Sequence, residues 1–191
     1  MKKTNEHHHI IISGVGRSGT TFLMQLFTQL KMDTGFSDIY ESINPNCNAG
    51  MEGFNIYDET SPYITKSPFF CDCLEEIIEE RDIIIDHILI PIRDLYSAAQ
   101  SRIFLGDGAE GGLFGTRDPE QQEGILGRKL YNLIHIIVKY DIPTTFLLFP
   151  RIVTDPRYLF KKLKFMLKDI SYKKFLRAFY IVSTPEKVDY Y

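Results

Sequence analysis

Residues 9–31 read HIIISGVGRSGTTFLMQLFTQLK, in which a strand pattern, a glycine-rich turn and a helix pattern follow one another. It opens on three consecutive isoleucines, the composition of a short strand that is buried on both faces. A glycine-rich turn follows at residues 14–19. Large apolar side chains then recur at helical spacing from Thr20 to Lys31, at positions 22, 23, 26, 27 and 30. Strand, glycine loop and helix in this order indicate the first unit of a parallel α/β sheet.

The rest of the chain continues this alternation of strand and helix patterns. Apolar runs predict further strands at 35–40, 63–66, 86–92 and 144–149, and amphipathic runs predict helices at 69–81, 95–103, 129–140 and 156–167. The last strand, like the first, is expected to be buried. We expect an irregular segment at 41–62 and a mobile glycine-rich loop within 104–127. The pattern predicts a single α/β domain over residues 1–191, with a mostly parallel central sheet flanked by helices.

Composition and charge narrow the classes of partner. The 191 residues are 44% hydrophobic and carry a net charge of −3, but residues 1–150 hold 12 basic and 21 acidic side chains, and residues 151–191 hold 10 and 4. This balance argues against nucleic acid as the main partner and leaves a small anionic ligand open. No apolar run reaches the roughly 18–20 residues that span a bilayer, and no secretory signal is recognisable. We therefore expect no membrane partner and a cytoplasmic location; the oligomeric state stays open.

The three cysteines, Cys47, Cys71 and Cys73, do not form a metal or disulfide pattern. An odd number cannot pair within the chain, and the Cys-x-Cys lacks the second pair that a zinc site needs. We expect reduced thiols and no metal.

The sharpest chemical signal is the loop GVGRSGTT at residues 14–21. Between a buried strand and a helix, backbone N–H groups and the helix dipole favour a phosphate. The first six residues fit the spacing of a P-loop, but Thr20 stands where the P-loop lysine would follow Gly19. A positive charge is instead supplied from inside the loop by Arg17. The residues expected to bind the anion are Gly16, Arg17, Ser18, Gly19, Thr20 and Thr21.

The segment GVGRSGTTFL resembles the 5′-phosphosulfate loop of sulfotransferases that use 3′-phosphoadenosine 5′-phosphosulfate (PAPS), and the carbohydrate and protein-tyrosine branches are closest in pattern. In that family an Arg that ends a buried strand and a Ser eight residues later hold the 3′-phosphate. Arg93 and Ser101 have this spacing here, and a dianionic phosphate suits a guanidinium fork plus a hydroxyl donor. The resemblance implies a P-loop-type three-layer fold, PAPS as cosubstrate, and a carbohydrate or other small-molecule hydroxyl acceptor.

Two further matches nominate catalytic groups. The segment ITKSPFF resembles the family's Lys-Ser/Thr/Asp-Pro segment, which implies that Lys66 neutralises charge on the transferring group. The segment DIYES falls where the two branches carry a Glu, which implies that Glu41 is the base, with Glu52 or Glu59 as the next candidates. Arg17 would hold the phosphosulfate during an in-line transfer that requires no metal.

Other interpretations of these residues stay open. Lys66 can be a solvated lysine, and Glu41 can be an exposed or capping side chain. A nucleotide-dependent phosphotransferase also suits a P-loop shape, although the missing lysine after Gly19 disfavours it. A non-catalytic protein that binds a bisphosphonucleotide is the third possibility.

Overall fold

The computed structural model describes residues 7–44, 49–52, 55–80, 83–105 and 115–183, and its centre is a sheet of four parallel strands. The strands are β1 (His7–Ile12), β4 (Ile64–Lys66), β5 (Ile83–Ile92) and β6 (Thr144–Leu148), paired in the order β4-β1-β5-β6. A separate antiparallel pair joins β2 (Ile43–Asn44) to β3 (Ala49–Gly50). The predicted α/β class with a mostly parallel central sheet is confirmed.

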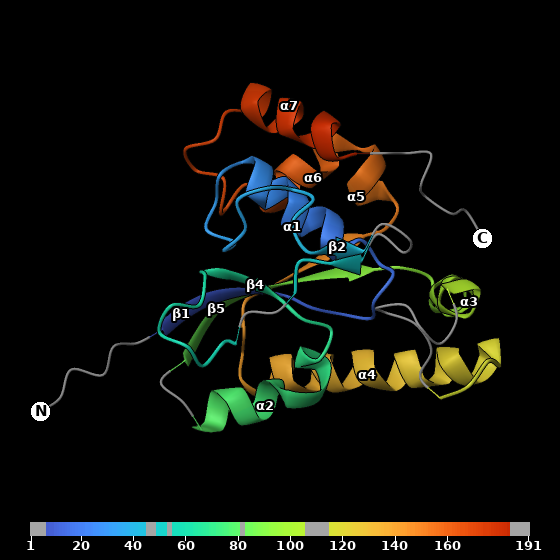
Figure 1. Cartoon of the computed structure of the whole chain (residues 1–191). Coiled ribbons are helices and arrows are strands. Elements are labelled where there is room, and N and C mark those ends of the chain that lie inside the picture. The colour runs from blue at the N-terminus through green and yellow to red at the C-terminus, as the bar shows by residue number, and fades with distance from the viewer. Residues whose placement is uncertain (1–6, 45–48, 53–54, 81–82, 106–114, 184–191) are drawn as a thin grey trace, which may run out of the picture.

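Helices cover both faces of this sheet (Figure 1). One face carries α1 (Thr20–Gln29), α5 (Arg151–Thr154), α6 (Pro156–Leu163) and α7 (Tyr172–Val182); the other carries α2 (Phe70–Glu80) and α4 (Pro119–Lys139). Successive side chains of β1 point to opposite faces, so Ile10 and Ile12 pack under α1 while Ile11 packs toward α2 and α4. Burial on both faces explains why this strand reads as an uninterrupted apolar run.

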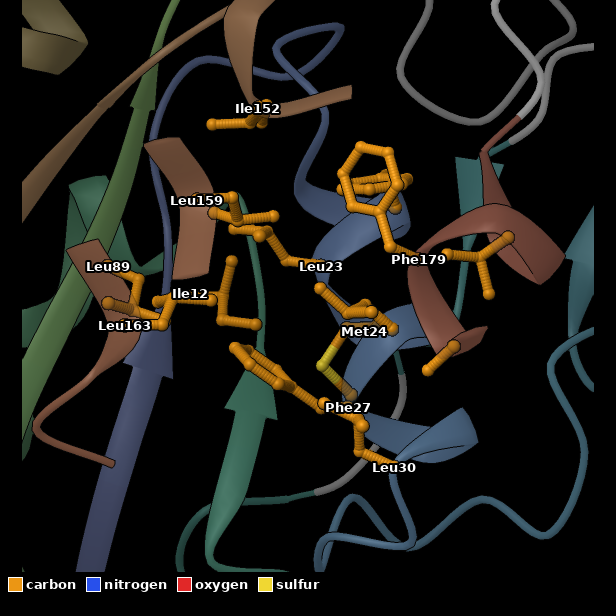
Figure 2. Packing of buried hydrophobic residues seen from close by; sticks show 14 of the residues in the cluster. Ile12, Leu23, Met24, Phe27, Leu30, Leu89, Ile152, Leu159, Leu163 and Phe179 are labelled. Carbon is orange, nitrogen blue, oxygen red and sulfur yellow. The ribbon is translucent and has the colours of Figure 1, made fainter. Parts of the chain in front are cut away.

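The apolar stripe of α1 anchors the larger core. Figure 2 shows Leu23, Met24 and Phe27 of α1 directed toward Ile12 of β1 and the neighbouring helices. Leu159 and Leu163 of α6 and Phe179 of α7 close the same cluster. Each such fully buried side chain stabilises the fold by about 1.5–3 kcal/mol relative to exposure. The packing fixes where α1 begins, and so where the preceding glycine loop lies.

The strand predicted at 35–40 does not form, and this prediction was wrong. Residues 33–42 make bends and turns, in which the Asp38 carboxylate accepts the Tyr40 N–H at 2.8 Å and the Glu41 carboxylate accepts the Ser37 N–H at 2.8 Å. Short polar side chains that bond nearby amides compete with strand pairing. The segment is tied to α1 because the Gln25 amide donates to the Ile39 carbonyl.

The helix predicted at 129–140 begins ten residues earlier than expected, at Pro119. Asp118 caps its first turn by accepting the Glu120 N–H at 3.0 Å, and Pro119 suits the first helical position. The glycines at 124 and 127 suggested a loop, yet the helix runs through both. Residues 106–114 of the expected loop lie outside the described residues.

Two differences concern the C-terminal third of the chain. The strand β6 was expected to be buried, but it is an outer strand of the sheet, and Phe146 and Leu148 are 42% and 52% exposed. The helix α7 was not predicted, although Phe175, Ala178, Phe179 and Val182 recur at helical spacing and Ser171 caps its start. It packs on α1 and completes the core on that face.

Within the described ranges, no helix is both long and apolar enough to cross a membrane.

Replacing Gly124 by Ala should stabilise the fold. The position is helical, and a Cβ placed there meets no atom within 4 Å. Alanine costs about 0.5–1 kcal/mol less than glycine inside a helix, so urea unfolding should show a gain of that size. The same change at Gly19 is the contrasting control, because a Cβ there would lie 2.9 Å from Ile152 Cδ1 at a φ of +92°. Equal effects of the two substitutions would contradict these local geometries.

Candidate functional site

Four segments of the chain, three of which hold predicted site residues, meet at one edge of the sheet because its strands are parallel. The glycine loop follows β1, Lys66 ends β4, Arg93 follows β5, and Phe149 follows β6. The helix after β1 lies on one face, whereas those after β4 and β5 lie on the other or beside the edge (Figure 1). Ligands of open α/β sheets bind at the carboxyl ends of the strands where the chain changes sides in this way. This edge is therefore the candidate site.

The backbone of the loop at 14–19 turns sharply into α1. Gly14, Arg17 and Gly19 have φ values of 133°, 70° and 92°, and Gly19 is the N-cap of α1 in the left-handed conformation. A side chain at Gly19 would press on Phe149 and Ile152, so only glycine fits there. The buried side chain of Val15 holds the loop in place, because it packs with Ala98 and Ala99 of α3 (Leu95–Leu105) and with Leu126 of α4.

The amides of this loop are available to an anion. Within the described part of the chain, the N–H groups of Gly16, Ser18, Gly19, Thr20 and Thr21 donate to no protein acceptor, and no side chain caps α1. Successive N–H groups around left-handed residues form an anion-binding concavity, and the helix dipole adds to it. The Ser18 hydroxyl, in contrast, donates to the Val15 carbonyl at 2.7 Å and holds the loop itself.

The structure brings the two predicted phosphate motifs into contact. Arg17 Nε donates to Ser101 Oγ at 3.1 Å, although the two residues are 84 positions apart. Arg93 Nη1 donates to the Arg17 carbonyl at 2.9 Å, and its guanidinium lies 5.1 Å from the centre of the Phe149 ring. Arg93 and Ser101 are both more than nine-tenths buried. Arg17, Arg93 and Ser101 thus form one cluster beside the loop.

A third arginine, Arg102, belongs to this cluster and was missed by the sequence prediction. Its side chain is fully buried, and its Nη2 lies 2.5 Å from where a Cβ of residue 16 would be, so Gly16 makes room for it. Burial and the Arg17 cation lower the pKa of Arg102 to about 10, which leaves it charged at neutral pH. A signal was present, because Ala98, Ser101 and Arg102 share the buried face of α3 at helical spacing.

Three groups among the described residues hold Lys66 at the start of α1. Its Nζ donates to Thr21 Oγ1 at 2.9 Å and to the Gly50 carbonyl at 2.6 Å, and it pairs with the Glu52 carboxylate at 2.8 Å. The side chain is almost fully buried, whereas Glu52 is 35% exposed. The β2–β3 pair supplies this contact, since Gly50 ends β3 and Glu52 follows two residues later. Lys66 is a buried, coordinated cation rather than a solvated lysine.

Glu41 lies in the turn at 37–42 and faces solvent. Its carboxylate accepts hydrogen bonds from Ser37 N, Ser37 Oγ and Asp38 N. The two bonds from Ser37 lower the pKa of Glu41. All three bonds lie within the turn and stabilise it. The structure does not bring Glu41 to Lys66; Glu52 occupies that place. Glu59, the remaining alternative, is exposed on a turn.

Cys71 and Cys73 are free, as predicted, and burial raises the pKa of both thiols. Cys47 lies outside the described residues. Among those that are described, no three His, Cys, Asp or Glu side chains gather as a metal site would require.

A scan of known protein-family models gave no match to this chain, and a search of curated proteins gave none either.

Proposed function

We propose that this protein is a PAPS-dependent sulfotransferase that moves a sulfuryl group to a hydroxyl on a carbohydrate or another small molecule. The observation that carries the proposal is the contact between Arg17 in the glycine loop and Ser101, with Arg93 bound to the same loop residue. Parallel strands bring the two motifs to the same end of the sheet, and this contact puts a guanidinium and a hydroxyl donor beside the loop amides, as a phosphate site requires. The fold then corresponds to a P-loop-type three-layer arrangement.

The residues at the site suit a nucleotide with phosphates at both the 5′ and 3′ positions. The loop amides and Arg17 would hold the 5′-phosphosulfate, and Arg93 with Ser101 would hold the 3′-phosphate. Arg102 adds a fixed positive charge beneath the loop. Thr20 lies at the helix start where the P-loop lysine would be, so a triphosphate lacks its usual cation.

Lys66 and Glu52 supply the groups that a transfer to a hydroxyl needs. The acceptor oxygen forms a bond to sulfur while the bond from sulfur to the bridging phosphate oxygen breaks, and the hydroxyl proton must leave. In our proposal Glu52 takes this proton, and Lys66 balances negative charge on the bridging oxygen. Glu41 is less suited to this role, because its carboxylate is engaged in its own turn and its pKa is lowered. Thr21 orients Lys66.

The test is transfer from PAPS with a radiolabelled sulfuryl group to a panel of sugars, phenols and tyrosine peptides in the presence of EDTA. Turnover should persist, because Arg17 and Lys66 provide the positive charge that magnesium provides in many phosphotransferases. Complete loss of transfer, restored by magnesium, would favour the phosphotransferase. Nucleotide binding without transfer to any acceptor would favour the non-catalytic binding protein.

A further inference from the structure

An open groove of about 910 Å³ lies along the outer strand β6, among residues that the proposed transfer does not use. Its walls are the strand on one side and α5 with α6 on the other. The lining residues are Thr144, Thr145, Phe146, Arg151, Asp155, Arg157, Tyr158, Lys161 and Lys162.

The backbone of β6 presents hydrogen-bonding groups to this groove. The bonds from Ile88 N to the Pro143 carbonyl and from Phe149 N to the Ile92 carbonyl, with the parallel register, direct the odd-numbered residues toward β5. Thr144, Phe146 and Leu148 therefore direct their N–H and C=O groups outward. The Leu148 N–H donates to the Tyr158 hydroxyl at 2.9 Å, but in the described structure the Phe146 N–H meets no protein acceptor.

Within the described ranges, the strand itself carries none of the features that usually prevent pairing at a sheet edge. Its sequence TTFLL has no charge and no proline, and two of its large side chains are exposed. Natural proteins commonly block such an edge with charges, proline, a bulge or a covering segment. An uncharged strand with outward N–H and C=O groups is a template for another extended polypeptide.

The positive charge of the groove favours an acidic polypeptide. Arg157, Lys161 and Lys162 are exposed on its helical wall. Among the described lining residues the single carboxylate is that of Asp155, which is bonded to Arg151 and caps α6 through the Tyr158 N–H, so it does not offset those three cations. A second copy of this chain paired through β6 would bring the same three cations together, and their repulsion disfavours it.

We propose that the outer edge of β6 docks an acidic, extended segment of a partner polypeptide, which adds a strand to the sheet. The backbone of the segment bonds to Thr144 and Phe146, and its carboxylates contact Arg157, Lys161 and Lys162. A polypeptide fits better than an anionic polysaccharide, because only a polypeptide matches the alternating donors and acceptors of the strand.

The probe is a fluorescein-labelled ten-residue peptide of alternating Val and Glu, with binding to the full chain followed by anisotropy at physiological salt. Reversal of the exposed pair, Lys161→Glu with Lys162→Glu, should weaken binding by more than about tenfold. The matched control is Lys173→Glu with Lys174→Glu in α7, an equal change of charge on another exposed surface. That control should change binding by less than about threefold.

The backbone contribution is tested separately from charge. The same peptide with alternate N-methylated amides keeps its carboxylates but cannot pair as a strand, and it should bind more than about tenfold more weakly. Phe146→Pro removes the outward donor without removing a bond to β5, whereas Phe146→Val keeps that donor. Only the proline variant should lose affinity, with circular dichroism to confirm that both are folded.

Three results would overturn the proposal. The first is no binding of the Val–Glu peptide. The second is equal weakening by the α7 control, which would indicate attraction to net charge alone. The third is that the N-methylated peptide and dextran sulfate each bind as tightly as the unmodified Val–Glu peptide, which would indicate a general polyanion surface.

Discussion

Glu52→Gln should lower the rate of sulfuryl transfer by roughly 10²–10⁴, because glutamine keeps the shape of the side chain but cannot accept a proton. Glu52 is the carboxylate that pairs with Lys66 at 2.8 Å, and it retains enough exposure to reach an acceptor. Nucleotide affinity should hardly change, since none of its described contacts involves the glycine loop. Single-turnover kinetics with saturating PAPS measure the effect on the chemical step.

Glu41→Gln is the matched control, with the same chemical change eleven residues away in the same segment. Its carboxylate serves the turn at 37–42, so the substitution should leave the rate within about threefold of the unmodified protein. The reverse pattern, in which Glu41→Gln is inactive and Glu52→Gln is active, would return the base to the residue that the sequence resemblance nominates. Equal and full activity of both variants would exclude each of them as the base.

Arg93→Ala should weaken binding of adenosine 3′,5′-bisphosphate by roughly 2–4 kcal/mol, or about 30- to 1,000-fold, as expected for loss of a charge-assisted contact to a phosphate. Affinity for ADP should fall much less, because ADP has no 3′-phosphate. The preference for the bisphosphate should therefore largely disappear. Calorimetric titration of both nucleotides against both proteins gives the comparison.

The structure offers a competing reason for an effect of this substitution. Arg93 also donates to the Arg17 carbonyl and lies over the Phe149 ring, so it supports the loop that would hold the 5′ group. If support of the loop is its main role, Arg93→Ala should weaken ADP and the bisphosphate equally. Arg93→Lys keeps the charge but loses the planar fork, and it should restore part of the affinity for the bisphosphate alone.

The fold could be predicted where one local pattern dominated. The three isoleucines before Ser13 and the apolar stripe after Thr20 correctly located β1 and α1, because burial on two faces and on one face leave different periods in a sequence. The pattern failed at 35–40, where polar side chains of Asp38 and Glu41 bind backbone amides, and at α4, where the helix tolerates glycines. Those outcomes depend on capping and tertiary contacts, which hydrophobic periodicity does not record.

The candidate site, like the fold, was predicted from the sequence only in part. Arg17, Arg93 and Ser101 were nominated by short motifs at the ends of strands, and parallel strands then bring those ends to one edge. The pairing of Lys66 with Glu52 depends on the β2–β3 pair inside a segment that has no periodic pattern. Arg102 is buried on a helix face beside Ser101. It was not predicted there, because charged side chains are seldom fully buried and a core is predicted from apolar residues.

We expect the carboxyl ends of β1 and β5 to recognise a 3′-phosphate, and calorimetric titration of the unmodified protein with adenosine 3′,5′-bisphosphate, ADP and ATP measures this preference. The cluster of Arg93 and Ser101 beside the glycine loop predicts that the bisphosphate binds at least about tenfold more tightly than ADP, and that ATP gains nothing from its third phosphate. Equal affinities for the bisphosphate and ADP, or tightest binding of ATP with magnesium, would exclude a site that selects a 3′-phosphate.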